Sequence, residues 1–314
     1  MTTSNGWPDL LKVELQPTTE ALHLWSQVVG KICLSFVPWT NHSWHVALYV
    51  SARGLSSGLI PIGTRAFEVE LDILGDFLSI RDTDGREKRI ALVPQSVATF
   101  YANTVQSLNE IGIDVRLNQM PCELPRAVLF HDDNVVRAYN GETARAYWRA
   151  LVLTHRVFHS FRTRFLGKCS PIHLFWGSFD LAVTRFSGRR APPHPGGALN
   201  LSDAVMRDAY NREVSSAGFW PAHGVASGPS YYSYAYPEPN GFGVARVLPV
   251  GAYFDAVLGE FLMPYEAVRA SADPDATLLT FLQSTYEAAA NLARWDRNIL
   301  EGPPGPVGQP PTGA

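Results

Sequence analysis

The chain is organised around residues 173–190, which read His173-Leu-Phe-Trp-Gly-Ser-Phe-Asp-Leu-Ala-Val-Thr-Arg-Phe-Ser-Gly-Arg-Arg190. Apolar residues at 179, 181 and 183 alternate with Ser178, Asp180 and Thr184, which is the period of a half-buried strand. A shorter strand is expected before Gly177, and the prolines and glycines of 191–197 predict a rigid loop afterwards. One face of the long strand should pack on a core, while the other carries a carboxylate and two hydroxyls. We therefore expect this strand to form one wall of a site.

Length and composition predict a soluble globular protein of one large domain or two ordinary ones. The chain has 314 residues, of which 46% are apolar and 18% are charged. Its 26 basic residues nearly match its 29 acidic ones, and no basic run is present, so we expect no nucleic-acid partner. No apolar run approaches the roughly 20 residues that span a bilayer, so we expect no membrane partner. The oligomeric state is left open.

The N-terminus and the cysteines predict a cytoplasmic protein. The first residues, Met-Thr-Thr-Ser-Asn-Gly-Trp-Pro, lack the basic and apolar regions of a signal peptide. Cys33, Cys122 and Cys169 are odd in number and widely spaced, which argues against a disulfide framework and a thiolate zinc site.

Two parts of the chain show a similar order of segments. Trp39 follows Lys31 by eight positions and Trp176 follows Lys168 by the same interval, and a predicted helix precedes each lysine. Later, Leu-Gly-Asp-Phe-Leu at 74–78 resembles Leu-Gly-Glu-Phe-Leu at 258–262. We expect an α+β protein of two similar α-β-β-β-α halves, with antiparallel sheets, helices outside and a central cavity. The alternative is chance similarity of amphipathic segments.

The expected organisation follows from these halves. It comprises an N-terminal lead-in at 1–17, a first half at 18–120, a connector at 121–142, a second half at 143–301 with an inserted loop at 192–231, and a disordered Pro/Gly-rich tail at 302–314.

Several stretches together resemble an uncharacterised bacterial family, Domain of Unknown Function 5996. They include Leu-His-Leu-Trp at 22–25, Asn-His-Ser-Trp-His-Val at 41–46, residues 167–189, Glu-Val-Ser-Ser-Ala-Gly-Phe-Trp-Pro at 213–221, Tyr-Ala-Tyr-Pro-Glu-Pro at 234–239 and Phe-Leu-Gln-Ser-Thr-Tyr-Glu-Ala-Ala at 281–289. The resemblance covers nearly the whole chain apart from the tail, and it implies no particular activity.

His42 and His45 are the candidate metal ligands. Two imidazoles three residues apart could reach one divalent transition metal if His42 lies in a turn, with His173, Glu68, Glu70 or Asp180 completing the set. The alternative is two hydrogen-bonded histidines in an aromatic core. The chain shows no nucleotide-cofactor motif.

His173, Asp180 and His45 are the candidate catalytic residues. A carboxylate beside an imidazole fixes its tautomer and raises its basicity, as acid–base catalysis requires. Arg185 is expected to clamp a substrate anion. The alternative is a structural Asp–Arg pair in the sheet.

The remaining binding candidates lie at the end of the strand in 173–190, in the loop after it, or in the segments around 213 and 234. Arg189 and His194 would form an anion-binding edge, Glu213 could line the same cavity, and Tyr234 could stack on a planar ligand with Tyr232 and Tyr236. For each of these the alternative is an ordinary structural role, in the core for the tyrosines.

The sequence favours an enzyme acting on a small, anionic molecule through His/Asp acid–base or His–metal chemistry in a cavity between the halves. One alternative is a non-catalytic small-molecule binding or sensing protein with the same cavity. Another is a protein-interaction scaffold with Trp220 in an exposed apolar patch.

Overall fold

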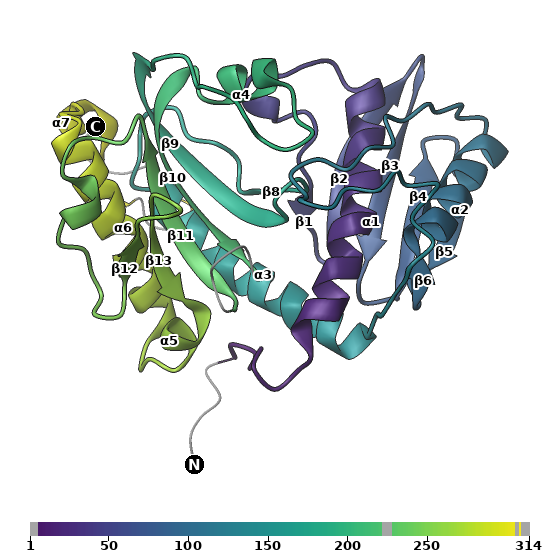
Figure 1. Cartoon of the computed structure of the whole chain (residues 1–314), viewed down its shortest axis with the longest axis horizontal. Coiled ribbons are helices and arrows are strands. Elements are labelled where there is room, and N and C mark those ends of the chain that lie inside the picture. Colours follow the sequence, from purple (N-terminus) through teal and green to yellow (C-terminus); the bar gives the residue numbers. More distant parts are fainter. Residues whose placement is uncertain (1–5, 222–227, 305–307, 309–314) are drawn as a thin grey trace.

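The computed structural model describes residues 6–221, 228–304 and 308 as a mixed α+β protein with two large antiparallel sheets, one two-stranded sheet and helices packed around them (Figure 1). The expected α+β class with antiparallel sheets is thereby confirmed, whereas the duplication stays a prediction. Most of the tail at 302–314 lies outside the described residues.

The first sheet is a five-stranded meander that lies between two helices in the chain order. Helix α1 (Leu15–Phe36) precedes it, and α2 (Val97–Glu110) follows it, with the Ser96 hydroxyl accepting from the Thr99 amide at its start. The strands are β1 (Tyr49–Val50), β2 (Gly54–Ile62), β3 (Arg65–Asp72), β4 (Phe77–Asp82) and β5 (Glu87–Ala91), paired in that order.

The two faces of β3 follow its alternating sequence. Phe67, Val69 and Leu71 are fully buried in the core. On the other face Glu68 and Glu70 bind Arg81, so these candidate metal ligands are engaged in ion pairs.

The second sheet has six strands and contains the segment that opened the sequence argument. Its order is β12-β13-β11-β10-β9-β8. The bounds are β8 (His173–Phe175), β9 (Asp180–Arg190), β10 (Arg212–Trp220), β11 (Ser230–Tyr236), β12 (Tyr253–Asp255) and β13 (Glu260–Pro264).

The range expected as an inserted loop, 192–231, needs correction. It contains the short helix α4 (Asp203–Ala209) and the strand β10, which pairs with β9 on one edge and β11 on the other. Only residues 191–202 and the turns beside α4 and β11 remain irregular among those described. The connector holds β7 (Val136–Arg137), which pairs with β6 (Gln95–Ser96).

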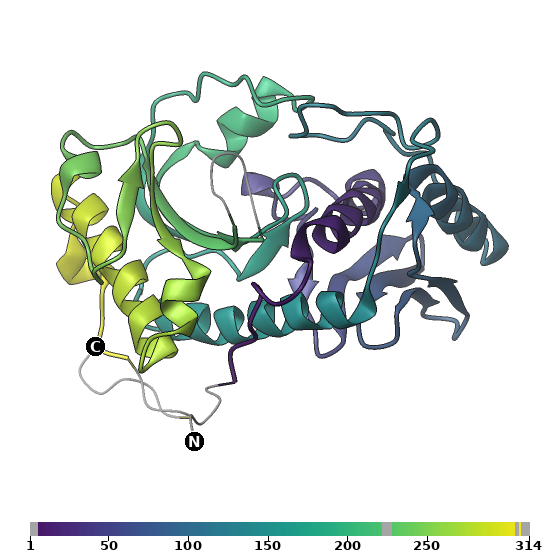
Figure 2. The ribbon, with the colours of Figure 1, turned by 60° about the horizontal axis from the view of Figure 1, so that its bottom comes forward.

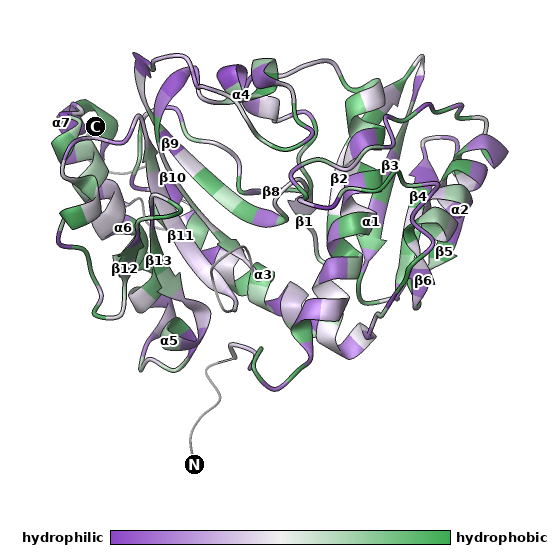
Figure 3. Cartoon of the chain, in the orientation of Figure 1, coloured by the Kyte–Doolittle hydropathy of each residue, from purple (hydrophilic) through white to green (hydrophobic). Residues whose placement is uncertain are grey.

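One face of the six-stranded sheet is covered by helices. Leu181, Val183 and Phe219 point to this face and are buried, and the apolar middle of β9 is green in Figure 3. The covering helices are α3 (Gly141–Arg162) and α6 (Pro274–Leu292), with α5 (Tyr265–Arg269) and α7 (Arg297–Leu300) near the ends of α6. Figure 2 shows α3 running beneath both sheets, so this helix ties them together.

The two sheets meet directly where β8 approaches the start of β1. Leu48 and Leu174 exchange two backbone hydrogen bonds of 2.9 and 2.7 Å, and the Trp176 indole donates to the Val46 carbonyl at 2.8 Å. The same indole lies against α1, because a Cβ on Gly30 would be 2.0 Å from its Nε1 atom. Gly30 therefore marks a close approach of this ring to the middle of α1, which continues to Phe36.

Within the described ranges, no helix combines the length and apolarity that a membrane span requires.

Candidate functional site

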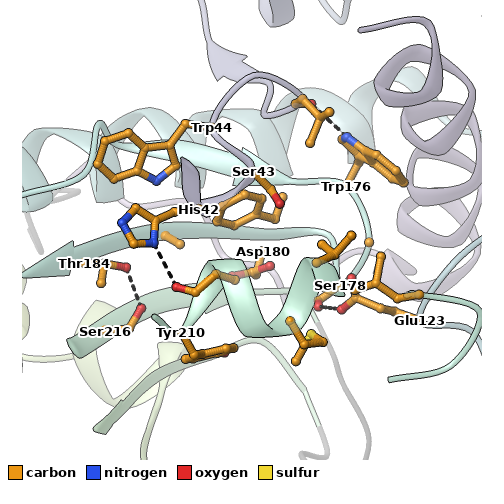
Figure 4. Close-up of a pocket in the computed structure, with 18 of the residues that line it drawn as sticks. His42, Ser43, Trp44, Glu123, Trp176, Ser178, Asp180, Thr184, Tyr210 and Ser216 are labelled. Atoms are coloured by element: carbon orange, nitrogen blue, oxygen red, sulfur yellow. Dashed lines mark hydrogen bonds between the residues drawn. The ribbon is translucent and has the colours of Figure 1, made fainter. Parts of the chain in front are cut away.

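A pocket of about 350 Å³ lies on the face of the six-stranded sheet opposite α3 and α6 (Figure 4). This volume is near the lower end of the roughly 300–1,000 Å³ that small-molecule sites occupy. Strands β8 to β11 and β13 form its floor. The cover comes from α4, from the turn η1 (Asn41–Ser43) with the residues after it, and from Cys122 and Glu123 in the connector.

The centre of the floor is an aromatic ring that lies flat on the sheet. Tyr232 of β11 passes over Gly218 of β10, where a Cβ would be 2.3 Å from its hydroxyl oxygen. Its ring stacks on that of Trp220 at 4.5 Å between centroids and 23° between planes. Glycine at 218 is thus required for Tyr232 to reach across the sheet toward β9.

Asp180 is the first acidic group of the pocket, and it accepts a hydrogen bond from the Tyr232 hydroxyl. The Tyr232 hydroxyl donates to its Oδ2 atom, and only 6% of the residue is exposed. The pKa of Asp180 is raised to about 7, chiefly by burial; the hydrogen bond from Tyr232 acts to lower it, and the nearby Glu123 charge acts to raise it. A carboxyl with this pKa is present in both protonation states at neutral pH.

Glu260 is the second acidic group, and sequence reasoning did not identify it. It begins β13, and its buried Oε2 atom has no hydrogen-bond partner in the described part of the chain. Burial and then the Asp180 charge raise the pKa of Glu260 to about 8. Its placement depends on the pairing of β13 with β11, a long-range contact for which the sequence carries no local signal.

Other polar groups of the pocket are paired with each other. The Ser178 hydroxyl donates to Glu123 at 2.5 Å, and the Thr184 and Ser216 hydroxyls are 2.8 Å apart (Figure 4). Tyr234 lines the pocket, as the sequence hypothesis requires, and its hydroxyl lies 2.8 Å from that of Tyr210.

His42 lies in a turn and lines the pocket, but the protein occupies both of its ring nitrogens. Nδ1 is 2.9 Å from the Ala209 carbonyl, and Nε2 is 2.7 Å from the Lys168 ammonium. Because ammonium only donates, Nε2 accepts and Nδ1 carries the proton. Burial lowers the pKa of His42, which keeps the ring neutral.

His45 also lines the pocket, and its Nδ1 accepts from the Thr40 amide at 3.2 Å. Across the described ranges, no three His, Cys, Asp or Glu side chains are grouped so that they could hold a metal ion. The arrangement around His42 and His45 therefore gives the metal hypothesis no support.

His173 lies outside the pocket, and its expected pairing with Asp180 is not formed. The side chain is on the pocket face of β8, but Phe175 packs against it at 4.4 Å between centroids and Trp44 at 6.4 Å. Its exposure is 0%, and neither ring nitrogen has a partner in the described structure. Burial, with the Arg162 charge, lowers the pKa of His173 to about 3, so the residue is a neutral core group.

Arg185 is on the opposite face of β9 and cannot clamp a ligand in this pocket. Its guanidinium donates to the Phe161 carbonyl and is stacked 3.4 Å from the Phe161 ring centroid and 4.2 Å from that of Tyr286. Burial lowers its pKa to about 10. Residue 185 shares the parity of 181 and 183, and this signal alone would have placed it on the core face.

The remaining candidates also lie outside the pocket. Arg189 binds Glu213 at 2.6 Å and the Ala293 carbonyl at 2.6 Å, so both residues tie β9 and β10 to the end of α6. His194 stacks on Tyr210 at 4.7 Å, behind the pocket wall. Trp220 is 5% exposed, so its side chain is not part of an exposed apolar patch.

Comparisons with known proteins identify a family. No curated protein and no solved structure matches the chain. One family model matches residues 7–302, nearly the whole chain, and its family has no known function. The chain belongs to this family of unknown function, DUF5996.

Proposed function

We propose that this protein is an enzyme that binds a small, largely apolar organic molecule in the aromatic pocket and moves a proton through Asp180. The observation that carries the proposal is the placement of this carboxyl. It is buried inside a ligand-sized pocket and held by the Tyr232 hydroxyl.

The chemistry follows from this environment. A general acid or base works best when its pKa is close to the operating pH, and that of Asp180 is about 7. The Tyr232 hydroxyl orients the carboxyl, and the stacking of Tyr232 on Trp220 fixes the hydroxyl in turn. Glu260 would bind the substrate, because its buried Oε2 has no partner among the described residues.

The pocket supports an uncharged or positively charged molecule better than the anion expected from the sequence. Its walls include Trp44, Trp176 and Phe186, and none of the described residues that line it is lysine or arginine. Arg185 and Arg189, the two arginines expected to bind an anion, lie outside this pocket.

The test uses a panel of aromatic and alicyclic ketones, alcohols, amines and esters incubated with the protein in D₂O. Mass spectrometry then detects either a new product or deuterium incorporated at carbon. We expect at least one compound to change with the wild type and not with Asp180→Asn, which keeps the shape and the acceptor for Tyr232. Asp132→Asn, at an exposed carboxylate of the connector, is the matched control and should react like the wild type.

A second function is non-catalytic binding of the same class of molecule. It is favoured by the aromatic floor and by the hydrogen bonds that the pocket histidines His42 and His45 make to the protein backbone. Compounds that raise the melting temperature but are never altered would establish this function and reject catalysis. If no compound binds or reacts, both proposals are wrong.

The metal hypothesis stays a prediction with its own test. Elemental analysis would compare the wild type with the His42→Ala/His45→Ala double variant. If the two histidines are metal ligands, the wild type should contain stoichiometric metal and the double variant should not.

A further inference from the structure

We infer that the pocket takes an organic cation, whose positive charge lies against the Glu260 carboxylate and the aromatic rings of the pocket. This inference rests on the proposed pocket and names the class of molecule that it binds.

The acidic side chains outnumber the basic ones among the described residues that line the pocket. Glu123, Asp180 and Glu260 line it, and no lysine or arginine does so among the described residues. His42 and His45 add no positive charge, because burial lowers the pKa of each ring. An anion inside the pocket would therefore lie among carboxyl groups, whereas a cation would be attracted to them. The Lys168 ammonium lies at the edge of the pocket, 2.7 Å from His42 Nε2.

The walls add a second attraction for positive charge. The faces of tryptophan, tyrosine and phenylalanine rings attract cations within about 6 Å of the ring centroid. The protein already uses this interaction at the edge of the pocket, where Lys168 Nζ lies 5.0 Å from the centroid of Trp44 and 4.8 Å from that of Phe186. The rings of Tyr210, Tyr232 and Tyr234 also line the pocket and could make the same type of contact with a ligand.

Glu260 is the group that lacks a counterpart. Asp180 accepts a hydrogen bond from the Tyr232 hydroxyl, and Glu123 accepts one from the Ser178 hydroxyl. Oε2 of Glu260 has no hydrogen-bond partner in the described part of the chain. A buried carboxylate without a partner is unfavourable, and the empty pocket therefore favours its protonated form. A cation bound in the pocket places a positive charge beside this carboxyl group and shifts Glu260 to the ionised form.

Binding should therefore release a proton from Glu260, and affinity should rise with pH. The groups that face Glu260 are Asp180 of β9, Asp255 of β12 and the hydroxyls of Tyr210, Tyr232 and Tyr234. Burial raises the pKa of Tyr210 to about 12 and those of Tyr232 and Tyr234 well above the ordinary value, so they keep their protons below pH 9. With a pKa of about 8 for Glu260, affinity should increase about tenfold from pH 7 to pH 9. Asp180, with a pKa of about 7, would add only about a factor of two over this range.

The experiment compares benzyltrimethylammonium with neopentylbenzene, which has the same shape without the charge. Tryptophan fluorescence gives the affinities at pH 7 and pH 9, and calorimetry in two buffers of different ionisation enthalpy gives the protons released. We expect the cation to bind at least tenfold more tightly than the neutral isostere at pH 9, with close to one proton released at pH 7. Glu260→Gln should remove both the preference and most of the pH dependence. Glu238→Gln, an exposed carboxylate beside Gly259, is the matched control and should leave both unchanged.

Equal binding of the two compounds, or a cation affinity that does not depend on pH in the wild type, overturns the inference even if Glu260→Gln fails to fold. If a neutral compound is then converted in an Asp180-dependent reaction, the proposed function still stands. If the cation binds through Glu260 but no compound is ever converted, the inference stands and catalysis is rejected.

Discussion

His173 provides the sharpest test of the structure, because its burial makes a quantitative prediction about acid stability. The folded chain holds this imidazole neutral down to a pKa of about 3, whereas the unfolded chain protonates it near 6.5. Its stabilising contribution is therefore complete above pH 6.5 and is lost as the pH falls from 6.5 toward 3. At about 1.4 kcal/mol per pH unit, the free energy of unfolding should fall by about 3 kcal/mol between pH 6.5 and pH 4 from this residue alone.

The perturbation that isolates this contribution is His173→Leu. Leucine removes two ring nitrogens that have no partner in the described structure, so the variant should be at least as stable as the wild type at pH 7. Urea unfolding followed by tryptophan fluorescence at pH 7, 5.5 and 4 gives the difference between the two proteins, in which the titration of all other groups cancels. The variant should gain about 3 kcal/mol relative to the wild type by pH 4. His131→Leu, at a half-exposed ring, is the control and should show no such gain. A constant difference between His173→Leu and wild type at all three pH values would refute the burial of a neutral imidazole.

Three further predictions concern the pocket and its surroundings. Gly218→Ala should lower the free energy of unfolding by about 1–3 kcal/mol in urea titrations and weaken binding of the panel compounds, because the new Cβ displaces Tyr232 from Asp180. Arg185→Lys should cost about 1–3 kcal/mol by the loss of the planar stack between Phe161 and Tyr286, yet leave the affinity for benzyltrimethylammonium unchanged, because residue 185 is on the opposite face of β9. Chemical unfolding should show Glu260→Gln to be more stable than the wild type by about 1–3 kcal/mol at pH 8, with no difference near pH 4.5. The reason is that the raised pKa of Glu260 makes the free energy of unfolding of the wild type fall as the pH rises from 4.5 to 8.

Local alternation was sufficient to predict β8 and β9 and to divide the side chains of β9 between two faces. Asp180 and Thr184 line the pocket and Leu181 and Val183 are buried under α3, as the period of two predicts. The same rule places Arg185 under the helices, so the expected anion clamp conflicted with the parity of its own strand. The error came from giving the chemistry of the side chain more weight than its position.

The rest of the pocket depends on contacts between distant segments, which no local pattern reports. Glu260 enters through the pairing of β13 with β11, and Glu123 through the connector, more than 50 residues before Asp180 in the chain. His173 illustrates the opposite case. The sequence placed a histidine and a carboxylate on neighbouring strands, but the rings of Phe175 and Trp44 cover the imidazole. Which polar side chain stays open to a pocket is decided by the packing of its neighbours.

Backbone strain is a further reason to locate the function at this pocket. Seven non-glycine residues of the described chain have positive φ angles, and three of them, His42, Ser43 and Glu123, line the pocket, with φ of 63°, 58° and 60°. A fourth, Phe179 with φ 58°, lies between Ser178 and Asp180. Such conformations cost about 1–3 kcal/mol each and persist only where the surrounding structure enforces them. Two of these four residues lie in the turn that covers the pocket, one lies in the connector and one precedes β9. Three separate segments of the chain are therefore strained where they meet at the pocket. A fold that required only stability could relax all four with glycine, and their common location argues that the pocket geometry itself is what the chain maintains.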